Sequence, residues 1–388
     1  MSVAGAHGPL LTGADAARAL RVAEHVFARC LRALETEPPA APESPAGFGG
    51  SLLTGDALLR AGGSIPSSLR EIAQAALVTA PHRRSLHEGR AGLLAVLDAV
   101  DAGGTAFARP RAALRAALAD ELRTAGPLDP SDRYGFDLIA GAAGKLIALR
   151  EVPGDVAAHV RARFAAFADR VEERLAEPGA TDTPLDTGVA HGVPGILAAL
   201  NVALPEERAL ARRYAELIVA LSHEVDGARR WDAVWSRERV PPPRRAWCYQ
   251  TAGVAGVLHD RALLDGDAAL RALARDALLG TLREPEQPHW DDALCHGRSG
   301  VALIYARLAG EDERFAREAE RLARRVLDDY RDDAPFGYRA YDLIERAERD
   351  RPQFLDGALG VALFLTHAAA PSELRWVPLL GLRPGAPQ

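Results

Sequence analysis

The stretch Gly357–Leu365, with the sequence GALGVALFL, holds the pattern that decides the fold: two glycines three positions apart, followed by an apolar run. Amphipathic stretches rich in Ala, Arg, Glu and Leu separate the copies of this pattern. A step repeated at such intervals is typical of arrays built from one supersecondary unit. Its six clear copies begin at Gly89, Gly141, Gly192, Gly253, Gly297 and Gly357.

Each repeat predicts a glycine turn, a mostly apolar helix and an amphipathic helix. A helix that is apolar all round is buried, and one with a single apolar stripe lies outside it. Such helix pairs form an open solenoid when stacked in a line, or a double-walled ring when closed. The segment 50–55, GSLLTG, is a candidate seventh copy. We therefore predict one all-α domain over 1–388, with clear repeats from about 87 to 365.

Two segments fall outside this repeat pattern. Residues 228–245 contain two tryptophans and three consecutive prolines, which predicts a loop or a short hairpin. The chain after Leu382 is rich in proline and glycine, so we expect a flexible tail.

The composition excludes several classes of function. A net charge of −6 gives no electrostatic reason to expect nucleic acid or an anionic membrane as a partner. Three cysteines are too few for a disulfide framework, and Cys30 lies in a helical pattern that predicts burial. The sequence shows no signal peptide and no apolar stretch long enough for a membrane span. We expect a cytoplasmic protein.

Chemically active residues stand just before the repeat glycines. In a closed ring they would gather at one mouth, because each glycine would mark the same end of an inner helix. Two thiols and an imidazole make a suitable zinc site with one open position, although buried free cysteines are also common in protein cores. The residues concerned are His87, Glu88, Asp137, His191, Cys248, Tyr249, Cys295, His296 and Asp356.

Four motifs resemble those of the lanthionine synthetase C-like family, the cyclases of lanthipeptide biosynthesis. They are Trp247-Cys248-Tyr249, Cys295-His296-Gly297, Ala190-His191-Gly192 and the segment 137–141, DLIAG. The resemblance runs from about His87 to Leu365 and implies an α/α toroid of about seven helical hairpins. One departure is that the family has glycine after the Trp-Cys-Tyr motif, where this chain has Gln250.

The resemblance also implies a set of site residues. It implies a Zn²⁺ ion bound by Cys248, Cys295 and His296, and an acid/base role for His191. It places Asp137 near His191, and Arg244 and Tyr249 at the site. From the residues alone, Asp137 is equally suited to capping the following helix. Arg244 is suited to pairing with Asp137 or steadying an enolate oxygen, and Tyr249 to packing or to enolate contact.

Two thiolates and one neutral imidazole cancel the charge of zinc, which leaves a bound substrate thiolate electron-rich. This favours addition of thiol to a dehydroamino acid over hydrolysis. We therefore predict a cyclase that forms thioether rings in a dehydrated precursor peptide, binds its leader, and works after a separate dehydratase. The alternatives are an isoprenoid enzyme similar to a protein prenyltransferase β-subunit, and a non-catalytic scaffold of a maturation complex.

Overall fold

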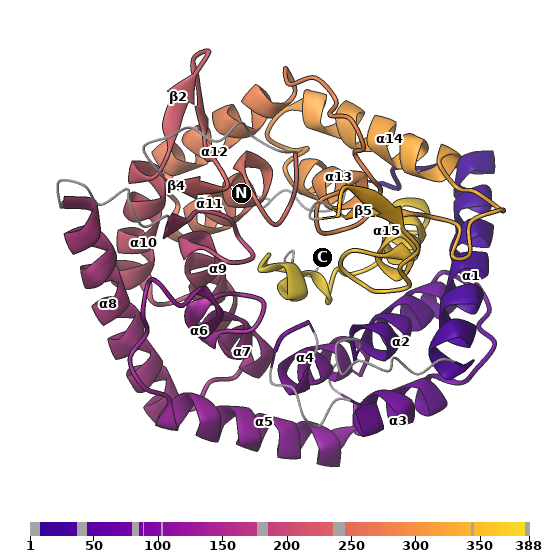
Figure 1. Cartoon of the computed structure of the whole chain (residues 1–388), viewed down its shortest axis with the longest axis horizontal. Coiled ribbons are helices and arrows are strands. Elements are labelled where there is room, and N and C mark those ends of the chain that lie inside the picture. The colour runs from indigo at the N-terminus through magenta and orange to yellow at the C-terminus, as the bar shows by residue number, and fades with distance from the viewer. Residues whose placement is uncertain are drawn as a thin grey trace.

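Two concentric rings of helices form the molecule in a computed structural model (Figure 1). The structure describes residues 8–36, 45–79, 85–87, 89–101, 104–176, 185–235, 245–342 and 345–384. The inner ring contains α2 (Pro45–Arg60), α4 (Arg90–Val100), α7 (Ala142–Leu149), α9 (Val193–Ala203), α11 (Thr251–Asp265), α13 (Arg298–Arg307) and α15 (Ala358–Ala369). The outer ring contains α1 (Gly13–Thr36), α3 (Leu69–Thr79), α5 (Ala108–Thr124), α8 (Gly154–Ala176), α10 (Arg208–Ala220), α12 (Ala268–Thr281) and α14 (Glu313–Asp328).

The ring closes where α15 packs against α1 and α2 (Figure 1). The closed form of the predicted array is therefore confirmed, as is the α/α toroid. The candidate seventh copy, residues 50–55, lies within the inner helix α2. Burial separates the two rings as expected: α9 is buried all round apart from Val202, whereas α14 buries one stripe that includes Phe315, Leu322 and Val326.

The second glycine of the step permits a close approach between each inner helix and the segment before it. A Cβ at Gly300 would lie only 1.9 Å from the carbonyl oxygen of Leu294. The same contact with the carbonyl six residues earlier recurs at Gly92, Gly144, Gly195, Gly253 and Gly360. Because no side chain fits there, every repeat requires glycine at this position.

The register of the fourth copy differs from the sequence prediction. Gly253 lies inside α11, and the residue before the first helical position is Gln250. Gln250 therefore stands where Gly297 stands before α13. The step predicted at Gly253 and Gly256 therefore starts three residues too late. Gly256 lies inside the helix three positions after Gly253, so the two have the same spacing as a true step.

Short strands and a central segment complete the fold. Segment 228–245 was predicted as a loop or short hairpin, and its first residues do form one strand of a hairpin. The antiparallel pairs are β1 (Leu185–Asp186) with β4 (Val234–Trp235), β2 (His223–Val225) with β3 (Ala228–Arg230), and β5 (Ala340–Asp342) with β6 (Ala347–Arg349). A short helix α6 (Arg133–Phe136) precedes α7, and the 3₁₀ helix η2 (Val377–Leu380) lies in the middle of the ring (Figure 1).

The C-terminal segment anchors the centre of the ring. Trp247 donates its indole N–H to the carbonyl of Leu380 at 2.7 Å, which ties the central segment to the inner ring. Leu382 is fully buried, so the chain is held at least to this residue. The predicted flexible tail falls mostly on residues 385–388, which lie outside the described part.

A buried histidine in α15 predicts acid sensitivity. Burial lowers the pKa of His367 from 6.5 to about 4. The unfolded chain then binds a proton near pH 6.5, whereas the folded chain binds it only near pH 4, so stability falls as the pH drops through this window. We expect His367 to account for about 3 kcal/mol of lost unfolding free energy between pH 7 and pH 3.5. Urea unfolding of His367→Leu should show a correspondingly smaller loss than wild type, and parallel losses would contradict this.

Candidate active site

Backbone hydrogen bonds join the segments before the inner helices, each to the next around the ring. Leu138 N–H donates to Ala190 O at 3.1 Å, and Ala190 N–H donates to Cys248 O at 3.1 Å. Cys248 N–H donates to Cys295 O at 3.1 Å, and Cys295 N–H donates to Leu355 O at 2.8 Å. Residues far apart in sequence are thereby brought to one mouth, as the sequence predicted.

The two cysteines of this mouth form a thiol pair. A side-chain hydrogen bond joins the thiols of Cys248 and Cys295; it lowers the pKa of Cys248 and, together with burial, raises that of Cys295. The charge of His296 also lowers the pKa of Cys248, so the imidazole lies close by. Within the described residues, no three His, Cys, Asp or Glu side chains stand in metal-binding geometry. The donor types fit zinc, while their arrangement here is that of a hydrogen-bonded pair.

A buried carboxylate that sequence reasoning missed holds His296. Asp291 Oδ2 lies 3.0 Å from His296 Nδ1 and accepts the backbone N–H of Tyr341, in β5, at 2.9 Å. Burial lowers the pKa of His296, but the Asp291 carboxylate more than offsets this, so the pKa is raised. A carboxylate on one ring nitrogen is the usual partner of a histidine that binds metal through the other.

His191 and Asp137 form a close pair beside the thiols. His191 Nδ1 lies 2.6 Å from Asp137 Oδ2, and Asp137 is completely buried. Asp137 Oδ1 accepts the backbone N–H groups of Ala140 and Gly141, both at 2.7 Å. The two roles left open by the sequence are therefore divided between the two oxygens: one organises the turn before α7, and the other orients His191. The Nε2 atom of His191 is left for other contacts.

A second carboxylate missed by sequence reasoning holds Tyr249. The Tyr249 hydroxyl donates to Asp186 Oδ2 at 3.1 Å, and its ring lies 6.1 Å from that of His191. Burial raises the pKa of Asp186, and burial together with Asp186 raises that of Tyr249. Arg133 of α6 reaches to 3.9 Å from the same carboxylate oxygen. In this arrangement the Tyr249 proton is engaged by Asp186.

The structure does not describe the arginine that the sequence predicts at the site. Arg244 lies outside the described residues. Its neighbour Arg245 is described, and its Nη1 lies 3.6 Å from Glu318 of the outer helix α14. Its guanidinium also lies over the ring of Trp290, 4.6 Å from the centroid. Arg245 thus takes part in a contact with the outer ring.

Three further residues were expected at the mouth, and the structure describes two of them, Asp356 and His87. Asp356, which the sequence places at the mouth, lies close enough to raise the pKa of Cys295 and His296. His87 is held deep between the rings of Trp247 and Phe354, 6.3 and 6.4 Å away. Burial lowers the pKa of His87 to about 3, partly offset by a hydrogen bond to the Leu379 backbone. Glu88, expected beside it, lies outside the described residues.

Gln250 carries backbone strain next to the thiol pair. Its φ of 71° and ψ of −168° belong to a region that is essentially reserved for glycine and costs about 1–3 kcal/mol for other residues. Its buried Nε2 atom has no hydrogen-bond partner among the described residues. We expect Gln250→Gly to raise the unfolding free energy by about 1 kcal/mol. Gln250→Ala is the matched control, because it removes the amide but keeps Cβ; equal stability of both variants would contradict the strain.

Fold and site together define a helical toroid with a thiol–imidazole cluster at its mouth. The sequence from residue 60 to residue 380 matches the family model of the lanthionine synthetase C-like protein, and the chain belongs to this family. The predicted resemblance is thus confirmed.

Among solved structures, nisin cyclase superposes with a TM-score of 0.68 over 93% of this chain and 96% of its own. The two sequences are 16% identical, so this likeness concerns the fold. A comparison with curated proteins finds no match. Among the described helices, none has the length and apolar character that crossing a membrane requires.

Proposed function

We propose that this protein is a zinc-dependent lanthipeptide cyclase. It would add cysteine thiols of a dehydrated precursor peptide to dehydroalanine or dehydrobutyrine, forming thioether rings. The observation that carries the proposal is the juxtaposition of two dissimilar clusters: the thiol pair of Cys248 and Cys295, and the His191–Asp137 pair. A backbone hydrogen bond from Ala190 N–H to Cys248 O joins the two clusters. Family membership supports the same chemistry.

Cys248, Cys295 and His296 would hold the zinc ion, with Asp291 fixing the His296 ring through Nδ1. When bound, the ion would lower the pKa of a substrate thiol and present it as a nucleophilic thiolate. The segments before the neighbouring helices α11 and α13 supply these ligands, so the site is part of the ring wall.

His191 would move the protons. As the new C–S bond forms at the β-carbon, the C=C electron pair shifts to give an enolate, and the α-carbon must then take up a proton. Asp137 occupies Nδ1 of His191, which leaves Nε2 as the atom that accepts the thiol proton and returns one to carbon. Tyr249, tied to Asp186, would hold the imidazole in place, and Arg244 would approach the enolate oxygen. The enzyme would bind the peptide leader and work beside a dehydratase.

Charge at the mouth disfavours an isoprenoid enzyme of the protein prenyltransferase type. A diphosphate needs a basic pocket, whereas the described mouth gathers carboxylates, namely Asp137, Asp186, Asp291 and Asp356. A non-catalytic scaffold has no need for a buried carboxylate, Asp137, that orients a histidine at the mouth. Both alternatives are therefore weaker than the cyclase.

The direct test is to incubate the zinc-loaded protein with a dehydrated precursor peptide and to count the remaining free thiols by alkylation and mass spectrometry. Ring formation removes one alkylation site per ring without changing the peptide mass. We expect loss of thiols above the rate of spontaneous addition. Unchanged thiol counts with several dehydrated precursors would overturn the proposal.

A further inference from the structure

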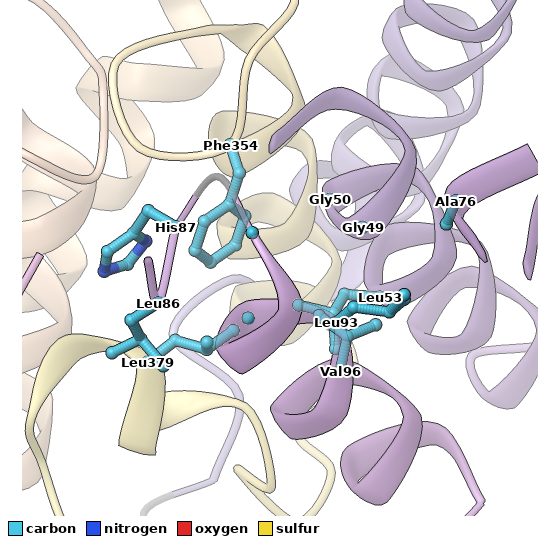
Figure 2. A pocket seen from close by; sticks show the side chains of 12 residues that line it. Gly49, Gly50, Leu53, Ala76, Leu86, His87, Leu93, Val96, Phe354 and Leu379 are labelled. Carbon is cyan, nitrogen blue, oxygen red and sulfur yellow. The ribbon is translucent and has the colours of Figure 1, made fainter. Parts of the chain in front are cut away.

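A small cavity lies between α2, α4 and the segment before α15 (Figure 2). Its lining is mostly apolar, and its polar part includes the imidazole of His87. The side chains that shape it are Leu53, His87, Leu93, Val96, Phe354 and Leu379. Its walls lie mostly in well-packed parts of the inner ring, where Leu53, Val96 and Leu379 are each at least 95% buried.

The size of the cavity limits what can enter it. The space open to the centre of a water-sized sphere is about 30 Å³. One water needs about 10–15 Å³ on this measure, so the cavity accepts about two waters or an alkyl group of comparable bulk. Among the described lining residues, His87 alone has a polar side chain, so two waters would have few side-chain partners there. An alkyl group of two or three carbons suits these walls better.

His87 marks one wall with an unused polar atom. Its Nε2 is buried and has no hydrogen-bond partner among the described residues. The ring lies 6.4 Å from that of Phe354, nearly parallel at 15°, which fixes it beside the cavity (Figure 2). A buried, unpaired nitrogen costs free energy unless a ligand completes its hydrogen bonding. A peptide backbone or amide group entering with an alkyl side chain would do so.

Two residues of the cavity wall, Phe354 and His87, adjoin segments of the candidate active site. Phe354 is followed by Leu355, whose carbonyl accepts the backbone N–H of Cys295 at 2.8 Å. On the other side, the ring of His87 lies 6.3 Å from that of Trp247, the neighbour of Cys248. A chain segment that presents a thiol to Cys248 and Cys295 therefore lies near residues of the cavity wall.

We propose that this cavity is a side-chain subsite for the substrate peptide, and that it receives a small alkyl side chain from a residue adjacent to the reacting cysteine. His87 Nε2 pairs with the peptide group of the same residue. The inference rests on the proposed function and deepens it, because it names a sequence preference of the substrate. Valine suits the space, glycine leaves it empty, and tryptophan exceeds it.

Binding of unreactive peptides tests the subsite without requiring catalysis. Short peptides carry one dehydroalanine and a serine in place of cysteine, and the residue beside the serine is glycine, alanine, valine or tryptophan. Isothermal titration calorimetry with the zinc-loaded protein should give valine peptides an affinity about tenfold higher than glycine peptides, since burying an isopropyl group favours binding by at least this factor. Equal affinities would overturn the inference.

Gly49→Ala is the sharpest variant. Among the described residues its added methyl would meet only Val96 Cγ2, at an ordinary 3.6 Å, so the fold should tolerate it while the cavity shrinks. We expect the valine preference to fall to about twofold or less. Gly154→Ala, on the outer helix α8 with nothing within 4 Å of the added atom, is the matched control and should keep the preference. A preference that survives Gly49→Ala unchanged contradicts the assignment.

His87→Phe tests the polar wall. It keeps an aromatic ring against Phe354 and removes the nitrogen, so all peptides should bind about tenfold more weakly, whatever their side chain. Undiminished binding would refute the role of His87. The cysteine versions of the same peptides report separately on cyclisation, so loss of the proposed activity and loss of the side-chain preference are distinct results.

Discussion

Cys295→Ala is expected to lose bound zinc and cyclase activity together. The substitution removes one of three proposed ligands and also the hydrogen-bond partner of the Cys248 thiol. Loss of an outer partner of a metal ligand already costs about 10- to 100-fold in affinity, so loss of a ligand should exceed this. Zinc content measured by plasma mass spectrometry should fall well below one ion per chain, and thiol loss from a dehydrated peptide should drop to the spontaneous rate.

Cys30 provides the control for this experiment. The chain has three cysteines, so Cys30→Ala leaves the proposed ligand pair as the only thiols. Cys30 is fully buried in α1, as predicted, and burial raises its pKa. We expect this variant to keep one zinc per chain with some loss of stability. The zinc hypothesis is wrong if Cys295→Ala keeps full zinc content, or if Cys30→Ala is the variant that loses it.

The repeat glycines show why so much of the fold was predictable. A Cβ at Gly300 would collide with the Leu294 carbonyl, and this steric demand returns in five further hairpins. The pattern is therefore imposed by backbone geometry and survives in the sequence. The register at Gly253 could not be assigned in the same way, because the residue that marks the start of α11 is Gln250, held at a φ that sequence statistics reserve for glycine.

The two missed carboxylates did leave a signal. Asp186 stands five residues before His191, and Asp291 stands five residues before His296. These are equivalent places in two repeats, and in each the carboxylate serves the mouth: Asp186 through Tyr249, Asp291 through His296 itself. Comparing offsets between repeats would have found them. No comparison of offsets could show that one oxygen of Asp137 binds the turn before α7 and the other binds His191. This division depends on how α6 and α7 meet.

His191→Phe is expected to lower the rate of cyclisation by about 10²- to 10⁴-fold, the usual contribution of a positioned acid or base. Zinc content should not change, because the substitution lies outside the proposed ligand set. His25→Asn is the matched control, since His25 lies on the outer helix α1 beside Tyr330 and far from the mouth in sequence.

Asp137→Asn should share the defect in part. The amide can still accept backbone N–H groups for the turn before α7, but it no longer presents a carboxylate to His191 Nδ1. Raising the pH separates the two proton transfers. At high pH the substrate thiol is already a thiolate, so a variant that lacks only the base for this thiol should be rescued. If His191 protonates the enolate, high pH should leave the defect in place, whereas rescue would assign it to thiol deprotonation. Wild-type rates in His191→Phe at every pH would show that another group moves the proton.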